Sequence, residues 1–152
     1  MSKKPIVPDD FVVPLSLAGD GFRLEPLGPE HNDADLAAWT SSIEHIRATP
    51  GFGEGEWPPA AGMSAAANLK DLERHARDFG NRVGFTYTVL DDGGVVVGCL
   101  YIYGSRTAEG VTDVRSWVRA ASAELDGPLH EAVAAWLASD WSFEKVEYRP
   151  GA

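Results

Sequence analysis

The sequence contains very little cysteine and no regular spacing of metal-binding side chains. Cys99 is the single cysteine among 152 residues, so the chain can form neither an internal disulfide nor a metal site built from several thiolates. Because Cys99 lies in the apolar stretch 95–100, we expect an inert, buried thiol rather than a nucleophile. The four histidines, which lack close ligand spacing, are His31, His45, His75 and His130. We therefore expect no metal ion.

Basic residues are also scarce. There are 13 Lys and Arg against 23 Asp and Glu, which gives a formal net charge of −10. Proteins bind the phosphates of nucleic acids through clustered Lys and Arg, and no such cluster occurs in this sequence. The charge balance therefore argues against DNA or RNA as a partner.

Long apolar runs are absent as well. No stretch of about eighteen consecutive apolar residues occurs, so the sequence predicts no membrane-spanning segment. Lys3 and Lys4 stand where a signal peptide carries its positive charge, but prolines and aspartates interrupt the residues that follow. Without an apolar region behind the lysines, no signal peptide is predicted. These absences together indicate a cytoplasmic protein with no membrane partner.

What the chain does contain is typical of one packed domain. Hydrophobic residues make up 44% of the sequence and five residues are Trp, which is too apolar and too aromatic for a disordered chain. A length near 150 residues favours a single domain. Three prolines within residues 1–20 predict an extended, partly ordered N-terminal arm. We expect residues 21–152 to form the domain itself.

Hydrophobic spacing predicts the order of the helices and strands. Strands are predicted at 22–27, 85–89, 95–103, 111–119 and 143–148, helices at 30–40, 42–48, 64–81 and 129–137, and a turn at 126–128. Ser42 and Ser64 are the predicted caps of the second and third helices. Three consecutive strands followed by a helical crossover to a last strand predict an α+β fold, in which a mixed, mostly antiparallel sheet carries helices on both faces.

Several stretches of the chain resemble those of one known family. They are FRLEPLGPEH, then paired helices, then FTYTVLDDGGVVVGCLYIYG, VTDVRSWVRA and PLHEAVAAWLA. In the order of their elements and the sequences of their strands, they resemble the GNAT superfamily of acyl-CoA-dependent N-acetyltransferases over roughly residues 21–149. The resemblance implies that the fourth strand splays from the fifth and that acyl-CoA lies in the cleft. It also implies that the CoA pyrophosphate binds to backbone N–H groups at the start of the following helix, where unpaired donors and partial positive charge favour an anion.

The stretch ELDGPL corresponds to the phosphate loop of this family. Only Gly127 keeps the residue type that is usual in the family. Glu124 stands where the family usually has a cationic or amide side chain, and Leu129 replaces a small residue. Asp126 suits a helix cap that would occupy donors needed by the pyrophosphate, and Pro128 has no N–H group. Two interpretations stay open: an altered CoA-phosphate loop, or an ordinary Asp-capped helix start.

The resemblance also implies a set of cofactor-binding residues. Trp117, Val118 and Arg119 match the strand segment whose backbone pairs with pantetheine, although core packing is an alternative role for them. Arg119 could supply a positive charge to bind the phosphate, but an ion pair between Arg119 and Glu124 is favoured. The candidate cofactor-binding residues are Trp117, Val118, Arg119, Asp126, Gly127 and Leu129.

Candidate catalytic residues are few. Asp113 is the carboxylate nearest to the family's usual Glu base, and Tyr148 lies on the last strand without matching the family's Tyr acid. In the loop 49–63, the residues Glu54, Glu56 and Trp57 follow the first helices, where the family recognises its acceptor. An acidic, aromatic loop could attract an amine. Alternatively the loop is a plain connection with its Trp tucked against the body.

Two functions follow from these observations. The first is acyl transfer from acetyl-CoA or another acyl-CoA to a primary amine of a small molecule or protein. The second is a catalytically inactive GNAT-fold module for ligand binding or oligomeric interaction, which the departures at Glu124 and Leu129 favour. The sequence also stops soon after the fifth strand, where the family continues with a helix and two strands. The resulting open sheet edge predicts a homodimer that covers it, or the N-terminal arm folding over it.

Overall fold

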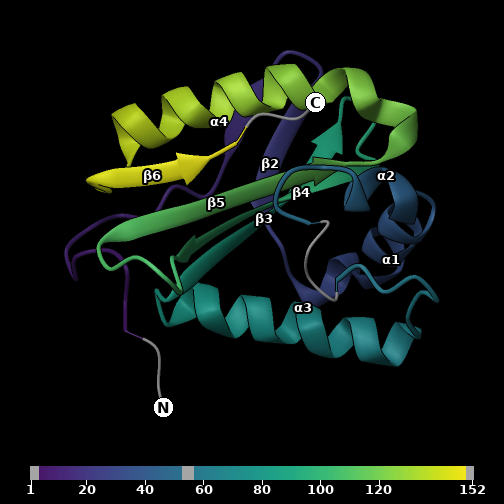
Figure 1. Ribbon diagram of the computed structural model, residues 1–152, viewed down its shortest axis with the longest axis horizontal. Coiled ribbons are helices and arrows are strands. Elements are labelled where there is room, and N and C mark those ends of the chain that lie inside the picture. The colour runs from purple at the N-terminus through teal and green to yellow at the C-terminus, as the bar shows by residue number, and fades with distance from the viewer. Residues whose placement is uncertain (1–3, 53–56, 150–152) are drawn as a thin grey trace.

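The computed structural model describes residues 4–52 and 57–149. Its elements in chain order are β1 (Leu17–Gly19), β2 (Phe22–Pro26), the 3-10 helix η1 (Pro29–His31), α1 (Asn32–Thr40), α2 (Ile43–Arg47), α3 (Ala65–Gly80), β3 (Gly84–Asp91), β4 (Val96–Gly104), β5 (Val111–Val118), the 3-10 helix η2 (Ala120–Leu125), α4 (Asp126–Asp140) and β6 (Lys145–Tyr148). Figure 1 shows α4 on one side of the sheet and α1 and α3 on the other.

The six strands form one sheet in the order β1-β2-β3-β4-β5-β6. Every neighbouring pair is antiparallel except β5 and β6, which run parallel because α4 carries the chain back between them. The predicted α+β fold, a mostly antiparallel sheet with helices on both faces, is therefore confirmed. In the described residues no helix is long and apolar enough to cross a membrane.

Strand alternation explains why each face of the sheet has its own core. Phe85, Tyr87 and Val89 of β3 face α4 and form one cluster with that helix's buried Leu129 and Val133. The other face carries a second cluster, which includes the fully buried Trp39, Cys99 and Trp117. Burial raises the pKa of the Cys99 thiol well above its ordinary value, as expected for an inert thiol.

The two predicted helix caps have different outcomes. Ser64 caps α3 as predicted, since its hydroxyl accepts the N–H of Ala67 at 3.1 Å. Ser42 precedes α2 but makes no side-chain cap, so that prediction is wrong. Its buried hydroxyl instead accepts the N–H of Ala120 at 2.8 Å. This bond ties the start of α2 to the end of β5.

The N-terminal arm packs across the sheet near the turn between α3 and β3. The N–H of Ile6 donates to the Arg82 carbonyl at 2.9 Å, and the Tyr87 hydroxyl donates to the Pro14 carbonyl at 2.6 Å. β1 is not predictable from the sequence, because Leu17–Gly19 is too short for a recognisable alternation. Within the described residues the arm makes no hydrogen bond to β6, so it does not pair with that sheet edge. The homodimer stays a prediction.

A buried polar network joins α1 to α3. Asn68 on α3 donates to Asp35 Oδ2 at 3.2 Å and to Asn32 Oδ1 at 2.8 Å, and it accepts the Trp39 indole N–H at 3.0 Å. Burial raises the pKa of Asp35 to about 6 from 3.8. The Asn68 hydrogen bond and nearby His31 oppose the rise, but desolvation is the larger effect.

Asp35 therefore makes stability depend on pH. Between about pH 4 and 6 the folded chain retains a proton that the unfolded chain releases, so the free energy of unfolding falls as pH rises through this window. Asp35→Asn should remove this loss and stabilise the protein by about 1 to 3 kcal/mol at pH 7.5, with no gain near pH 3.5. Denaturant melts at both pH values test this, with exposed Asp33→Asn as the control. An equal effect of Asp35→Asn at the two pH values would contradict it.

Candidate functional site

The strand β6 pairs with only the first half of β5. The pairing runs from Val111 opposite Lys145 to Val114 opposite Tyr148. In the described part of the chain, no strand lies beside residues 115–118 on that edge. Within the described residues, the β5–β6 ladder therefore ends at Val114 and Tyr148; the family resemblance predicts that the strands splay at such a place, and we call this place the splay.

The peptide groups at this open edge can be assigned from the neighbouring pair of strands. The Arg119 N–H donates to the Val97 carbonyl of β4 at 2.8 Å. Because successive peptide groups of a strand point in opposite directions, Trp117 also faces β4, whereas Ser116 and Val118 direct their N–H and C=O groups to the open edge. Of the three predicted pantetheine-pairing residues, Val118 alone has its backbone directed there.

Tyr148 spans the splay on the α4 side. Its ring packs against His130 of α4 with centroids 4.1 Å apart and ring planes tilted by 32°, and its hydroxyl lies 2.5 Å from Ser116 Oγ on β5. Burial is the main cause that raises the pKa of Tyr148 to about 12. The phenol is therefore neutral at physiological pH, and it joins the two strands where their backbone pairing ends.

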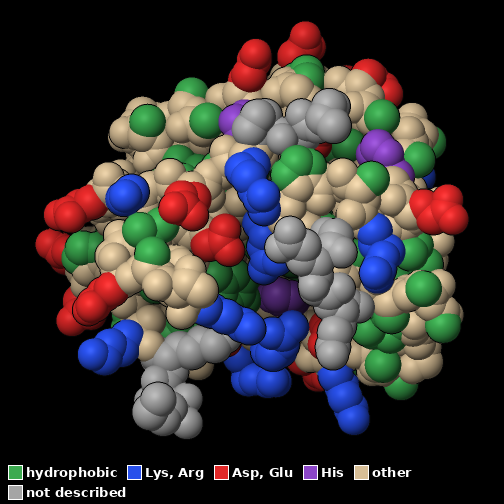
Figure 2. Space-filling model, in the orientation of Figure 1, with side chains coloured by type: hydrophobic (Ala, Val, Ile, Leu, Met, Phe, Trp, Pro, Cys, Tyr) green, Lys and Arg blue, Asp and Glu red, His purple; other side chains and the backbone are tan. Residues whose placement is uncertain are grey.

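The other face of the splay is an open, charged cavity of about 480 Å³. Its lining is Pro50, Asp113, Val114, Arg115, Glu147, Tyr148 and Arg149. Asp113 and Glu147 are register partners on the parallel strands, so their carboxylates leave the same face of the sheet. Figure 2 shows side chains of both charge signs beside a hollow near the middle of this view.

Arg115 connects this cavity to the loop before α3. Its Nε lies 3.8 Å from Asp113 Oδ2, and its guanidinium donates to the Gly51 carbonyl at 3.0 Å. The guanidinium also lies over the Phe52 ring, 5.5 Å from the centroid. The φ of Gly51 is +97°, and its missing side chain leaves room for the stem of Arg115. Sequence reasoning missed Arg115, Glu147 and Arg149. Strand parity with Asp113 would have placed Arg115 on the same face, whereas Glu147 reaches that face only through the register of β5 and β6.

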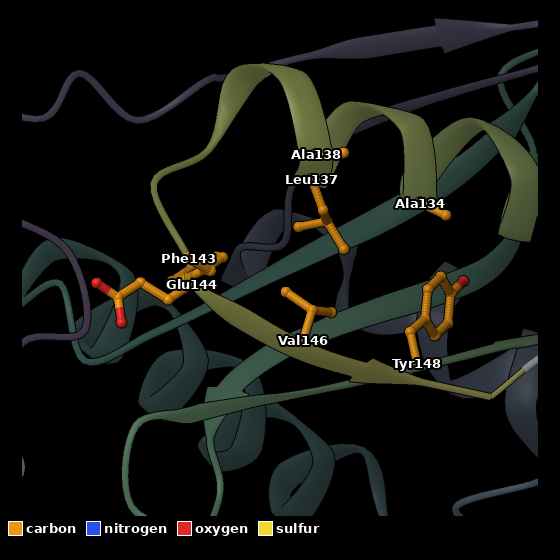
Figure 3. Close-up of a pocket in the computed structure, with 7 residues that line it drawn as sticks. All are labelled: Ala134, Leu137, Ala138, Phe143, Glu144, Val146 and Tyr148. Atoms are coloured by element: carbon orange, nitrogen blue, oxygen red, sulfur yellow. The ribbon is translucent and has the colours of Figure 1, made fainter.

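A second cavity, of about 350 Å³, lies between α4 and β6. Its lining is Ala134, Leu137, Ala138, Phe143, Glu144, Val146 and Tyr148 (Figure 3). The Leu137 side chain points from α4 toward Val146, while the Glu144 carboxylate points away from the groove. Tyr148 lines both cavities and separates the apolar one from the charged one.

The start of α4 differs from the sequence prediction. Residues 126–128 are helical rather than a turn, because η2 runs directly into α4 and Pro128 falls in the first helical turn, where its missing N–H is tolerated. The N-cap is Leu125 rather than Asp126, and no side-chain hydrogen bond caps it, so the expected Asp cap is wrong. The Asp126 N–H donates to the Ala123 carbonyl. Gly127 is exposed, with open space where a Cβ would lie.

The remaining predicted residues lie in the core or near this helix start. Trp117 is fully buried and donates its indole N–H to the Tyr101 hydroxyl at 3.0 Å. Leu129, a residue of α4, is also fully buried. The expected Arg119–Glu124 ion pair is wrong, since the described hydrogen bond of the Arg119 guanidinium goes to Ser122 Oγ at 3.4 Å. Asp113 and Tyr148 thus lie together where the β5–β6 ladder ends. The candidate cofactor-binding residues do not gather there, because some lie on β5, some are buried in the core and others lie at the start of α4.

The acidic loop is described only in part. Glu54 and Glu56 lie outside the described residues. Trp57 packs against aromatic rings of the body, with centroids 5.4 Å from Trp39 and 6.1 Å from Trp117. The interpretation that this Trp is tucked against the domain is therefore confirmed. Among residues 4–52 and 57–149, no group of three or more His, Cys, Asp or Glu could hold a metal ion.

Comparison with known proteins identifies this fold. No protein-family model matches the chain, and no curated protein matches it. A solved putative ribosomal-protein-serine acetyltransferase from Vibrio cholerae aligns with a TM-score of 0.69 at 9% identity, over 94% of this chain and 75% of that one. RimJ of Mycobacterium smegmatis aligns with a TM-score of 0.66 at 11% identity, over 85% of this chain and 62% of that one. The chain has the GNAT acetyltransferase fold.

A third solved structure agrees with this assignment. The ribosomal-protein-S5-alanine acetyltransferase from Vibrio fischeri aligns with a TM-score of 0.64 at 12% identity, over 82% of this chain and 67% of that one. The resemblance predicted from the sequence is confirmed at the level of the fold. At these identities the likeness carries no activity or substrate from one protein to the other.

The hydrogen bond between the hydroxyls of Tyr148 and Ser116 should contribute measurably to the free energy of unfolding. Tyr148→Phe and Ser116→Ala should each lower the free energy of unfolding by about 1 kcal/mol, because each leaves the other hydroxyl without its partner. The double variant should lose little more than either single variant, which a double-mutant cycle of denaturant melts measures. Strictly additive losses would show that the two hydroxyls do not interact.

Proposed function

We propose that this protein transfers an acyl group from a thioester, with acetyl-CoA or another acyl-CoA as the donor, to a primary amine. The observation that carries the proposal is the open edge of β5, which lies between an apolar and a charged cavity. Solved neighbours support it, since one is described as RimL in complex with coenzyme A and another as MccE in complex with acetyl-CoA and AMP.

The open edge suits the pantetheine part of such a donor. A pantetheine arm carries two amides, which can form hydrogen bonds with the peptide groups of a strand. Ser116 and Val118 direct their backbone N–H and C=O groups to this edge. A backbone N–H at the same edge can also polarise a thioester carbonyl as negative charge develops on its oxygen. These groups are held by the β4–β5 pairing, so they need little rearrangement to act.

The start of α4 does not suit the pyrophosphate of CoA. The Asp126 N–H already donates to Ala123, Pro128 has no N–H, and the carboxylates of Glu124 and Asp126 would repel a phosphate. The residues present therefore fit the thioester arm and not the nucleotide.

The charged cavity suits an amine acceptor. Asp113 and Glu147 leave the same face of the sheet, so both can attract an ammonium group into the cavity. In the reaction, the ammonium group first releases one proton, and the neutral amine nitrogen then forms a bond to the thioester carbonyl carbon. The carbon–sulfur bond breaks, and the departing sulfur takes the second proton of the nitrogen and leaves as a thiol. We assign Asp113 as the group that takes the proton released by the amine.

A second function is favoured by the helix start. The closed helical turn at Asp126 supports a catalytically inactive GNAT-fold module that binds a ligand or an oligomeric partner. Such a module can retain the open β5 edge without carrying out transfer. The two functions differ in turnover and not in fold.

A melting curve with and without millimolar acetyl-CoA tests the proposal. Ligand at one hundred times Kd stabilises the folded state by about 2.7 kcal/mol, which raises Tm by several degrees for a chain of this size. If millimolar acetyl-CoA does not raise Tm, acyl transfer from acyl-CoA is ruled out as the function.

Thiol release then separates the transferase from the inactive module. Free thiol should appear when acetyl-CoA is mixed with the protein and a primary amine, using amino acids, spermidine and a short peptide with a free N-terminus as probes. Asp113→Asn should slow release by about 10²-fold, whereas Asp92→Asn, an equal charge change in an exposed turn, should leave it unchanged. A melting shift without thiol release for any of these amines would favour the inactive module.

A further inference from the structure

The charged cavity combines two acidic residues with two arginines in an ordered arrangement. Asp113 and Glu147 are register partners on the parallel strands β5 and β6. Arg115 follows Asp113 by two residues, Arg149 follows Glu147 by two residues, and all four line the cavity. Because both strands run in the same direction at about 3.3 Å per residue, both arginines leave the backbone roughly 7 Å further along than the acids. The cavity therefore has an acidic level and a basic level.

Arg115 is held in position by the protein itself. Its guanidinium donates to the Gly51 carbonyl at 3.0 Å and lies over the Phe52 ring, 5.5 Å from the centroid. A Cβ on Gly51 would lie 2.7 Å from Arg115 Cδ, so the stem of the arginine needs a glycine there. The nearby Asp113 Oδ2 is 3.8 Å from Arg115 Nε, which is too far for a hydrogen bond. Arg115 is thus oriented without using its remaining donors on that carboxylate.

The groups that line the cavity are accessible to a ligand. The side chains of Arg115 and Asp113 are 43% and 45% exposed, and Glu147 and Arg149 are exposed as well. Within residues 4–52 and 57–149, neither Glu147 nor Arg149 forms an ion pair. A simple amine is attracted by the acids but repelled by the arginines, and a simple anion meets the opposite arrangement. A compact ligand that carries both charges complements both levels.

We propose that the acceptor amine is a free amino acid, with its ammonium group at Asp113 and Glu147 and its carboxylate at Arg115 and Arg149. This inference rests on the proposed function and deepens it by naming the class of acceptor. A planar carboxylate can accept two parallel N–H donors from one guanidinium, which fixes its orientation. A protein N-terminus has a peptide group where a free amino acid has this carboxylate. A phosphate, with its larger negative charge, is repelled more strongly by the two acids.

The products follow from the same positions. The ammonium group releases one proton to Asp113, and the neutral nitrogen forms a bond to the thioester carbonyl carbon. The carbon–sulfur bond breaks, and the sulfur takes the second proton of the nitrogen. The reaction then yields an N-acyl amino acid and a free thiol.

Matched acceptors test this inference through thiol release from acetyl-CoA. The probes are a panel of free L-amino acids, the amide of each, spermidine, a short peptide with a free N-terminus, and O-phosphoethanolamine beside ethanolamine. At least one amino acid should have a kcat/KM about tenfold or more above that of its own amide, because the amide lacks the charged partner of the arginines. The other amines should all be slower, and the phosphate should give O-phosphoethanolamine no advantage over ethanolamine.

Two variants connect this preference to the cavity. Arg149→Gln removes one exposed charge, and Arg115→Lys keeps the charge but loses the planar pair of donors. Each should lower the ratio of kcat/KM for the preferred amino acid over its amide by about fivefold or more. Arg77→Gln, an equal charge change at an exposed position of α3, should keep the ratio of the unmodified protein. Since Arg115 also packs against Gly51 and Phe52, Arg149→Gln decides the result if Arg115→Lys does not fold.

Each contrary outcome has a distinct meaning. Equal kcat/KM for every amino acid and its amide would overturn this inference and leave the proposed function standing. Faster release with spermidine, the peptide or O-phosphoethanolamine, or an unchanged ratio in Arg149→Gln, would do the same. No thiol release with any of the amines would overturn acyl transfer itself, and the inference with it.

Discussion

The incomplete pairing of β6 with β5 is the constraint on which the candidate site depends. The parallel ladder stops at Val114 and Tyr148, so the last four residues of β5 keep an open edge in the described chain. Had the pairing continued, the peptide groups of Ser116 and Val118 would be used within the sheet. Within the described residues, the site therefore depends on where the β5–β6 ladder stops and not on an unusual side chain.

Tyr148 gives this short pairing a defined end. Its ring lies against His130, its hydroxyl reaches Ser116, and it separates the two cavities beside the splay. Because α4 packs on the sheet through Leu129 and Val133, the helix and β6 hold Tyr148 in this position together. The fold thus places an apolar groove, an open strand edge and a charged cavity in direct succession.

The fold could be predicted from the sequence more completely than the site. Alternating residue types in β3 and β5, the apolar run of β4 and the apolar stripe of α3 identified these elements. Their burial in the structure is less regular, because nearly every residue of β3 and β4 is buried. The turn predicted at Asp126 to Pro128 is helical, since Gly and Pro are tolerated in a first helical turn and composition cannot reveal that η2 precedes it. The hydroxyl of Ser42 bonds to Ala120, a residue far along the chain, and local spacing carries no information on such a partner. Glu147 joins Asp113 only through the register of two parallel strands, which the sequence does not specify.

The central claim is that a thioester donor binds along the open edge of β5 and away from the start of α4. Backbone amide chemical shifts, measured by NMR while acetyl-CoA is titrated into the protein, test it most directly. The account predicts that the amide signals of Ser116 and Val118 move during the titration while those of Gly127 and Leu129 stay in place. Movement of the Gly127 and Leu129 signals, with those of Ser116 and Val118 unchanged, would contradict it.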